Sequence, residues 1–137
     1  MEKEYITENS EETQSLGLLM AKEIRFGGVI LLSGDLGAGK TTLTQGLLSG
    51  LNVPEPYTSP TFVIMKKYGL NIYHFDAYRV EKEDILNLGW EEIMTDMSNI
   101  VIVEWAERIR EIAPKGAYWV DFLWMDENRR KIKIQRI

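Results

Sequence analysis

The stretch Gly34-Asp35-Leu36-Gly37-Ala38-Gly39-Lys40-Thr41 matches the phosphate-binding loop pattern G-x-x-x-x-G-K-[ST] at every fixed position. A continuous apolar run at 28–33 precedes it, which is typical of a buried parallel strand, and residues 42–48 follow as the start of a helix. Strand, glycine loop and helix in this order are the context that the loop requires. The sequence therefore predicts a nucleoside triphosphate site at the end of a buried strand.

Each fixed residue of this loop has a physical reason. Gly34 and Gly39 allow several backbone N–H groups to approach phosphate oxygens that a Cβ would keep away. The helix that begins near Lys40 adds the partial positive charge of its N-terminus. Lys40 is expected to reach the β and γ phosphates, and the Thr41 hydroxyl to bind Mg²⁺. A turn that only joined a strand to a helix would need neither of these last two side chains.

Composition limits the classes of protein that remain. With 137 residues and 45% hydrophobic content, we expect one domain over residues 1–137 with its own core. The net charge of −5 argues against a nucleic-acid-binding surface, so any contact with RNA is expected to be indirect. The lack of cysteine excludes thiol catalysis and a cysteine-based zinc site. No apolar run reaches membrane-spanning length and the first residues are too polar for a secretory signal, so we expect a cytoplasmic protein without membrane contact.

The rest of the chain alternates short helices and strands. A cap residue, Ser10, predicts the start of the first helix. The spacing of two strands around 69–71 predicts an antiparallel hairpin, and Ile85, Leu88 and Ile93 can share one helical face. We predict helices at 10–24 and 80–94, a short helix or turn at 106–112, and strands at 62–68, 72–76, 100–103, 118–124 and 131–135. The fold class is therefore α/β, a P-loop NTPase-like sandwich whose mixed central sheet includes an antiparallel hairpin.

Two acidic residues close apolar strands and are candidates for the second metal anchor. Asp76 ends the strand at 72–75, and Glu104 ends the strand at 100–103. Triphosphate chemistry needs an acid that binds the metal or orients the attacking water, so both qualify. The sequence leaves open which of them contacts the metal directly, and either could instead be a solvated carboxylate.

A threonine and two aromatic residues complete the set of candidates. Thr61, in Ser59-Pro60-Thr61-Phe62, resembles a switch threonine that senses a γ phosphate, although a proline turn with a capping hydroxyl would give the same pattern. Trp105 can stack on the base or ribose, although tryptophan more often packs in a core or an interface. His74 alternates with Asp76 and so faces the same side, but we assign it no catalytic role.

Taken together, four segments resemble the TsaE family, the P-loop ATPases of bacterial tRNA threonylcarbamoyladenosine biosynthesis. These segments are 34–42, 59–62, 74–79 (His-Phe-Asp-Ala-Tyr-Arg) and 103–105 (Val-Glu-Trp), and they occur in the family's order and spacing. The resemblance extends from about Thr13 to the final strands. Ala106, where the family often has proline, and the small Ala77 are the two departures from its pattern.

The resemblance implies an Mg²⁺-dependent ATPase with two partner subunits, TsaB and TsaD. Those partners transfer a threonylcarbamoyl group to an adenosine beside the anticodon, so this chain would meet tRNA only through the complex. It would hydrolyse ATP to reset or maintain the transferase complex between turnovers. Because its activity would depend on the partners, we expect weak hydrolysis by the isolated chain.

The resemblance also implies a set of site residues. It gives catalytic roles to Lys40, Thr61, Asp76 and Glu104, and Mg²⁺ coordination to Thr41, Glu104 and Asp76. The residues expected to bind ATP are Thr13, Asp35, Leu36, Gly37, Ala38, Gly39, Lys40, Thr41, Thr42 and Trp105. Arg129 or Arg130 is a further candidate for a position near the nucleotide.

Three other functions remain to be weighed. A small-molecule kinase is the main alternative, but it needs an acceptor pocket and an arginine-bearing lid, for which Arg108 and Arg110 are the candidates. A GTP-driven switch is disfavoured because the chain has no Asn-Lys-x-Asp motif for guanine. A nucleotide-binding subunit without turnover stays open.

Overall fold

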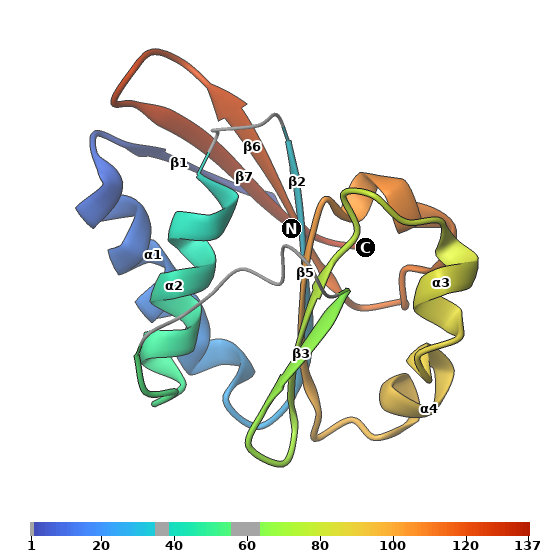
Figure 1. Ribbon diagram of the computed structural model, residues 1–137. Coiled ribbons are helices and arrows are strands. Elements are labelled where there is room, and N and C mark those ends of the chain that lie inside the picture. Colours follow the sequence, from blue (N-terminus) through green and yellow to red (C-terminus); the bar gives the residue numbers. More distant parts are fainter. Residues whose placement is uncertain (1, 35–38, 56–63) are drawn as a thin grey trace.

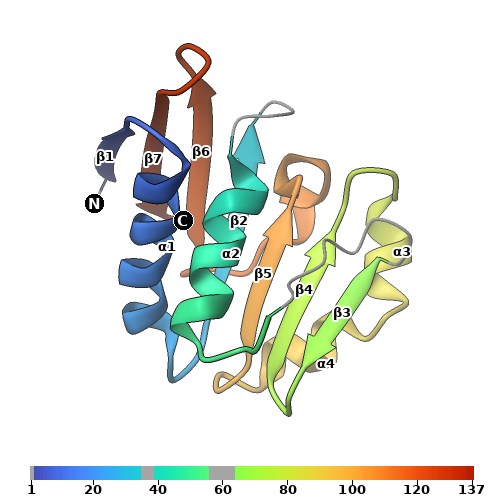
Figure 2. The same cartoon turned by 60° about the vertical axis from the view of Figure 1, so that its left-hand side comes forward.

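The computed structural model describes residues 2–34, 39–55 and 64–137. Its centre is a seven-stranded mixed sheet with the strand order β1-β7-β6-β2-β5-β4-β3 (Figure 2). The strands are β1 (Glu2–Thr7), β2 (Gly28–Gly34), β3 (Met65–Tyr68), β4 (Ile72–Asp76), β5 (Ile100–Glu104), β6 (Tyr118–Trp124) and β7 (Arg130–Arg136). The helices are α1 (Ser10–Ile24), α2 (Lys40–Gly50), α3 (Lys82–Leu86), α4 (Trp90–Thr95) and a 3₁₀ helix, η1 (Ala106–Ile112).

The four central strands are parallel, and the outer ones are antiparallel. β2 pairs in parallel with β5 and β6, and β5 pairs in parallel with β4. β3 pairs antiparallel with β4, which confirms the predicted hairpin, while β7 and β1 extend the other edge antiparallel. Because parallel strands all end at the same edge of a sheet, the last residues of β2, β4 and β5 lie along one edge.

Helices cover both faces of this sheet (Figure 1). An apolar core lies on each face. Along β2, Ile30 and Leu32 belong to the core under α1 and α2, whereas Leu31 between them belongs to the core under α3, α4 and η1. β5 alternates in the same way. This period of two explains the continuous apolar runs in the sequence, since a strand covered on both faces needs apolar side chains at every position.

Helices α1 and α2 touch through glycine. A Cβ built on Gly17 of α1 would lie 2.5 Å from the Leu43 carbonyl oxygen, and one on Gly46 of α2 would lie 2.2 Å from the Gln14 carbonyl oxygen. Any larger residue would therefore push the helices apart. This close approach holds the N-terminal end of α1 beside the first turn of α2.

The structure departs from the sequence expectations in four places. The cap of α1 is Asn9 rather than Ser10, since the Asn9 side chain accepts a hydrogen bond from the Glu12 N–H at 2.9 Å. The predicted helix at 80–94 is two short helices, because Gly89 adopts a left-handed φ of 88° between them, and Leu88 is left 38% exposed. Strand β1 was not predicted. Strand β6, expected to be half-exposed, lies between β2 and β7 and has the consecutive residues Trp119 and Val120 buried in the two cores, whereas its last two residues are exposed.

Candidate functional site

The described ends of the phosphate-binding loop adopt backbone conformations that favour glycine. Gly34 ends β2 with φ 130°, and a Cβ there would lie 2.5 Å from the Phe122 carbonyl oxygen. Gly39 precedes α2 with a left-handed φ of 105°. Asp35, Leu36, Gly37 and Ala38 lie outside the described residues, so their expected contacts with ATP stay predictions.

Lys40 begins α2 and is buried, with its ammonium group turned back toward the start of the loop. Its Nζ donates a hydrogen bond to the Gly34 carbonyl and lies 3.8 Å from the centre of the Trp105 ring. A cation over an aromatic face is stabilised by the negative potential of the ring. The two contacts hold the positive charge where the loop leaves β2.

Glu104 joins two residues that are distant in sequence. The Thr41 hydroxyl donates a hydrogen bond to Glu104 Oε1 at 2.9 Å, and His74 Nε2 lies 2.7 Å from Glu104 Oε2. Glu104 is 3% exposed and His74 is 2% exposed. The alternation of β4 and β5 places both side chains on the face that α2 covers, which brings the predicted metal ligand Thr41 to the carboxylate that ends β5.

Asp76 lies next to Glu104, since the two residues are register partners on β4 and β5. Burial raises the pKa of the Asp76 carboxyl above its usual value, a hydrogen bond from the Tyr78 N–H at 3.0 Å opposes the rise, and the charge of Glu104 adds to it. The structure thus brings the two predicted acids together. Thr61 lies outside the described residues, and its switch role stays a prediction.

Trp105 follows Glu104 in a backbone conformation that non-glycine residues seldom adopt. Its φ of 60° is left-handed, and its ring lies 4.7 Å from the Tyr78 ring, measured between centroids. Strain of this kind persists only where surrounding contacts enforce it, and it is common at functional sites. The conformation turns the indole toward Lys40 directly after the buried carboxylate.

A cavity of about 490 Å³ lies at the N-terminus of α2, beside Glu104 and Trp105. Its described lining comes from the N-terminal end of α1, the first turn of α2, the end of β5 and the turn between β6 and β7: Asn9, Ser10, Glu11, Thr13, Gly39, Lys40, Thr41, Thr42, Glu104, Trp105, Glu127, Asn128 and Arg130. Seven of the predicted residues are therefore in one place: Thr13, Gly39, Lys40, Thr41, Thr42, Glu104 and Trp105. Asp76 is not among the described residues of the lining.

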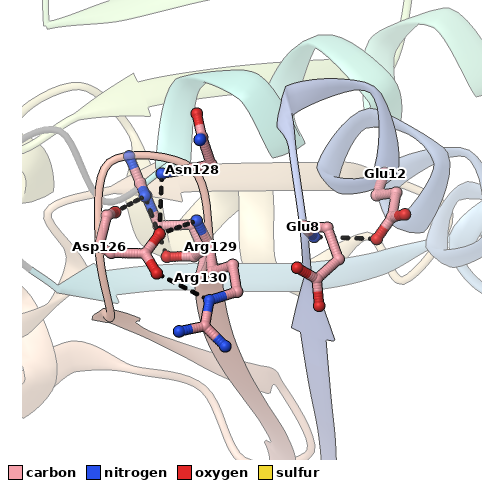
Figure 3. A network of polar contacts seen from close by, with 6 residues as sticks. All are labelled: Glu8, Glu12, Asp126, Asn128, Arg129 and Arg130. Atoms are coloured by element: carbon pink, nitrogen blue, oxygen red, sulfur yellow. Dashed lines mark hydrogen bonds and ion pairs between the residues drawn. The ribbon is translucent and has the colours of Figure 1, made fainter.

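We call the side of the cavity formed by Lys40, Glu104 and Trp105 the buried wall. The side formed by Glu127, Asn128 and Arg130 is called the turn wall. Figure 3 shows how Asp126 organises that turn, by accepting hydrogen bonds from the N–H groups of Asn128 and Arg129 and from the Arg129 guanidinium. The Arg130 guanidinium donates to the Asp126 carbonyl oxygen at 2.7 Å.

The N-terminal end of α1 forms a third side of the cavity. Figure 3 also shows Glu12 reaching back to accept a hydrogen bond from the Glu8 N–H, at 2.9 Å. Thr13, expected to border the nucleoside, is 2% exposed, and its hydroxyl lies 2.7 Å from the Thr7 hydroxyl. Thr13 therefore lines the cavity with little of its own surface.

The donor set fits Mg²⁺. Thr41 Oγ1 and Glu104 Oε1 are oxygen atoms 2.9 Å apart, and both residues line the cavity. Mg²⁺ in a triphosphate site takes most of its ligands from phosphate and water, so one or two protein oxygens suffice. Among the residues that the structure describes, no cluster of three or more His, Asp or Glu side chains is arranged to hold a metal by itself.

Two parts of the site were missed by sequence reasoning. The contact between His74 and Glu104 needs the register of β4 against β5, although the alternation of His74 with Asp76 did indicate the correct face. Asn9, Ser10, Glu11, Glu127 and Asn128 were not candidates, because they reach the cavity only through the packing of α1 and the turn. Of the two arginines considered, Arg130 lines the cavity, whereas Arg129 pairs with Asp126.

In the described ranges 2–34, 39–55 and 64–137, every helix is too short or too polar to cross a lipid bilayer.

Comparisons with known proteins agree over nearly the whole chain. The family model described as "Threonylcarbamoyl adenosine biosynthesis protein TsaE" matches residues 7–132, which include every described residue of the cavity lining. The chain is 43% identical to the tRNA threonylcarbamoyladenosine biosynthesis protein TsaE of Bacillus subtilis, with 92% of this chain and 80% of that protein covered. It is 41% identical to the protein of the same name from a Nostoc species, with 92% and 81% covered. A crystal structure of Bacillus subtilis YdiB matches with a TM-score of 0.82 at 31% identity, and covers 100% of this chain and 86% of that one.

Proposed function

Since this chain belongs to the TsaE family and so has that family's role in tRNA threonylcarbamoyladenosine biosynthesis, we propose that it is a magnesium-dependent ATPase acting on the TsaB–TsaD transferase complex. One observation carries the proposal. A buried lysine, a threonine hydroxyl and a buried carboxylate meet in one cavity at the N-terminus of α2. This is the set of groups that triphosphate hydrolysis requires.

The phosphates would lie at the N-terminus of α2, where the backbone N–H groups of the first turn and the helix dipole favour an anion. Lys40 would leave the Gly34 carbonyl and place its charge on the β and γ phosphates. Because Lys40 is buried, its interaction with phosphate would be weakly screened by water. The Trp105 ring, already in contact with Lys40, would keep the ammonium group on the phosphate side of the cavity.

Thr41 and Glu104 would hold Mg²⁺, which neutralises charge on the phosphate oxygens when bound. Glu104 would use the oxygen that now accepts the Thr41 hydrogen bond, while its other oxygen stays on His74. Asp76, next to Glu104 and with a raised pKa, would hold a water molecule or assist the metal from behind. Glu104 therefore has the central role in turnover.

The turn wall and the N-terminal end of α1 would enclose the nucleoside and the outer phosphates. Arg130 brings a guanidinium to the cavity, and Asn9, Asn128 and the Trp105 ring offer hydrogen-bonding and stacking groups. The cavity is open to solvent on the side of the exposed Asn9 and Asn128. A partner that covered it would exclude water and complete the site, which is a reason to expect hydrolysis to depend on TsaB and TsaD.

The test is ATP hydrolysis by the purified chain, with and without TsaB and TsaD, beside a Lys40→Ala variant. We expect slow release of phosphate by the chain alone and a clear rise with the partners. Lys40→Ala should lower turnover by about a hundredfold or more, because it removes a charge aimed at the transferred phosphate. Partners that neither bind nor raise turnover would contradict the proposal. ATP consumption that instead matched phosphorylation of an added metabolite would favour a small-molecule kinase.

A further inference from the structure

His74 lies behind the cavity, in contact with the residue on which turnover is proposed to depend. It is the chain's one histidine, it is 2% exposed, and it is absent from the described lining of the cavity. Its Nε2 is 2.7 Å from Glu104 Oε2. His74 is therefore not part of the described lining, and the described site residue that its ring contacts is Glu104.

The hydrogen bonds determine which ring nitrogen carries the proton. An ionised carboxylate only accepts hydrogen bonds, so Nε2 must donate to Glu104. The Nδ1 atom is buried, with no hydrogen-bond partner in the part of the chain that the structure describes. The other neutral tautomer would place a lone pair against the carboxylate and leave a buried N–H without an acceptor, which is costly. The geometry therefore favours a proton on Nε2, donated to Glu104.

The carboxylate of Glu104 needs this contact to have a defined orientation. The last torsion of a glutamate side chain is broad, so the residue itself does not fix the direction of its two oxygens. One oxygen is held by His74 at 2.7 Å, and the other accepts the Thr41 hydroxyl at 2.9 Å. Fixing Oε2 on the buried side therefore directs Oε1 to Thr41 and the cavity.

We propose that His74 is a positioning residue, whose Nε2–H fixes the Glu104 carboxylate so that one oxygen is presented to Thr41 and to the metal. The orientation of Glu104 by His74 concerns this chain alone, whereas the part about the metal rests on the proposed function. Groups that orient metal ligands in this way commonly change metal affinity or activity by about 10- to 100-fold when they are removed. His74 would thus set turnover without touching ATP.

The first test needs no nucleotide. Because the chain has one histidine, ¹⁵N labelling of histidine gives the ring signals of His74 alone. We expect the Nε2–H tautomer at neutral pH in the wild-type chain, and loss of this preference in Glu104→Ala, which removes the acceptor. An Nδ1–H tautomer, or an equal mixture in the wild type, would overturn the proposal, whatever the chain's enzymatic activity.

The second test compares two variants of His74, one with a hydrogen-bond donor in the side chain and one without. The amide N–H of His74→Gln can replace the Nε2–H donor, whereas His74→Leu fills the space without a donor. With the TsaB–TsaD complex and saturating ATP, we expect kcat to fall by about 10- to 100-fold in His74→Leu and to recover largely in His74→Gln. The Mg²⁺ concentration for half-maximal rate should rise in His74→Leu, and the affinity for ATP without metal should stay unchanged in both.

Thermal unfolding of the two variants separates positioning from stability. If His74→Gln and His74→Leu lost activity equally, or if the loss followed their melting temperatures, His74 would be only a core residue and the proposal would be wrong. The proposal would also be wrong if His74→Leu had the turnover and the Mg²⁺ dependence of the wild type. If the wild-type chain hydrolysed no ATP with its partners, the proposed function would fail, while the tautomer would still decide whether His74 orients Glu104.

Discussion

The buried wall and the turn wall of the cavity are held in place by different kinds of contact. In the buried wall, Glu104 is bonded to Thr41 and His74, which lie 63 and 30 positions away in the sequence. In the turn wall, Asn128 and Arg130 are held by hydrogen bonds to Asp126, two and four positions away. The first wall depends on the register of the whole sheet, whereas the second depends on one turn. This difference suggests that the buried wall sets the chemistry and that the turn wall adjusts affinity.

The largest effect is expected from Glu104→Gln in the buried wall. The amide keeps the size of the side chain but loses its charge and one acceptor oxygen, so it should bind a metal poorly. We expect kcat with the TsaB–TsaD complex to fall by about a hundredfold or more, with the dissociation constant for ATP changed by less than about threefold.

Glu111→Gln is the matched control for this change. Glu111 is an exposed carboxylate that pairs with Lys82, away from the described lining of the cavity. Its substitution should leave both constants unchanged. If Glu104→Gln lost ATP affinity as much as turnover, the two walls would not divide chemistry and affinity between them.

A smaller effect is expected from Arg130→Gln in the turn wall, and it should change ATP affinity rather than kcat. Arg130 is half-buried and reaches the cavity from a turn, so its attraction to a triphosphate is partly screened. We expect the dissociation constant for ATP to rise by about two- to fivefold, and kcat to stay within about twofold. Titration calorimetry and steady-state rates measure the two constants.

Arg129→Gln provides the control, because Arg129 has the same charge one position earlier but pairs with Asp126. It should weaken ATP binding less than Arg130→Gln. A large loss of kcat in Arg130→Gln with unchanged affinity would show that the turn wall takes part in the chemistry.

The smallest effect concerns the stability of the turn itself. Hydrogen bonds from the Arg129 N–H, the Arg129 side chain and the Asn128 N–H lower the pKa of Asp126 to about 2, from an ordinary value of 3.8. A lowered pKa contributes stability above pH 3.8, and that contribution is lost as the pH falls through about 2.

Asp126→Asn should therefore be less stable than the wild type above about pH 4, with the difference shrinking between about pH 4 and pH 2. Denaturant unfolding across that range measures the change. A difference that stayed constant with pH would show that the turn does not depend on the charge of Asp126.

The same distinction explains how much of the site could be predicted from the sequence. Lys40, Thr41 and Gly39 belong to one local motif, and Asp76 and Glu104 each end an apolar run, so neighbouring residues were enough to select them. The contact between His74 and Glu104 joins two strands in a register that no local pattern encodes. Arg130 could be named only as one of two arginines, because its place depends on the return of β7 beside β6.

The sequence predicted the strands that are covered on both faces, but it missed the polar edge strand β1 and the break between α3 and α4. β2 and β5 are covered on both faces and read as continuous apolar runs. β1 is an edge strand whose residues Glu2–Glu4 are exposed, so its composition is that of a polar terminus. The break between α3 and α4 depends on the left-handed Gly89, which the apolar spacing of 80–94 does not reveal.

The most direct test of the account is a crystal structure with Mg²⁺ and a non-hydrolysable ATP analogue. The account predicts the triphosphate at the N-terminus of α2, the Lys40 ammonium moved from the Gly34 carbonyl to the phosphates, and the metal in contact with Thr41 Oγ1. Glu104 Oε1 should face that metal while Oε2 stays on His74. A nucleotide bound elsewhere, or a metal whose shell excludes both Thr41 and Glu104, would contradict it.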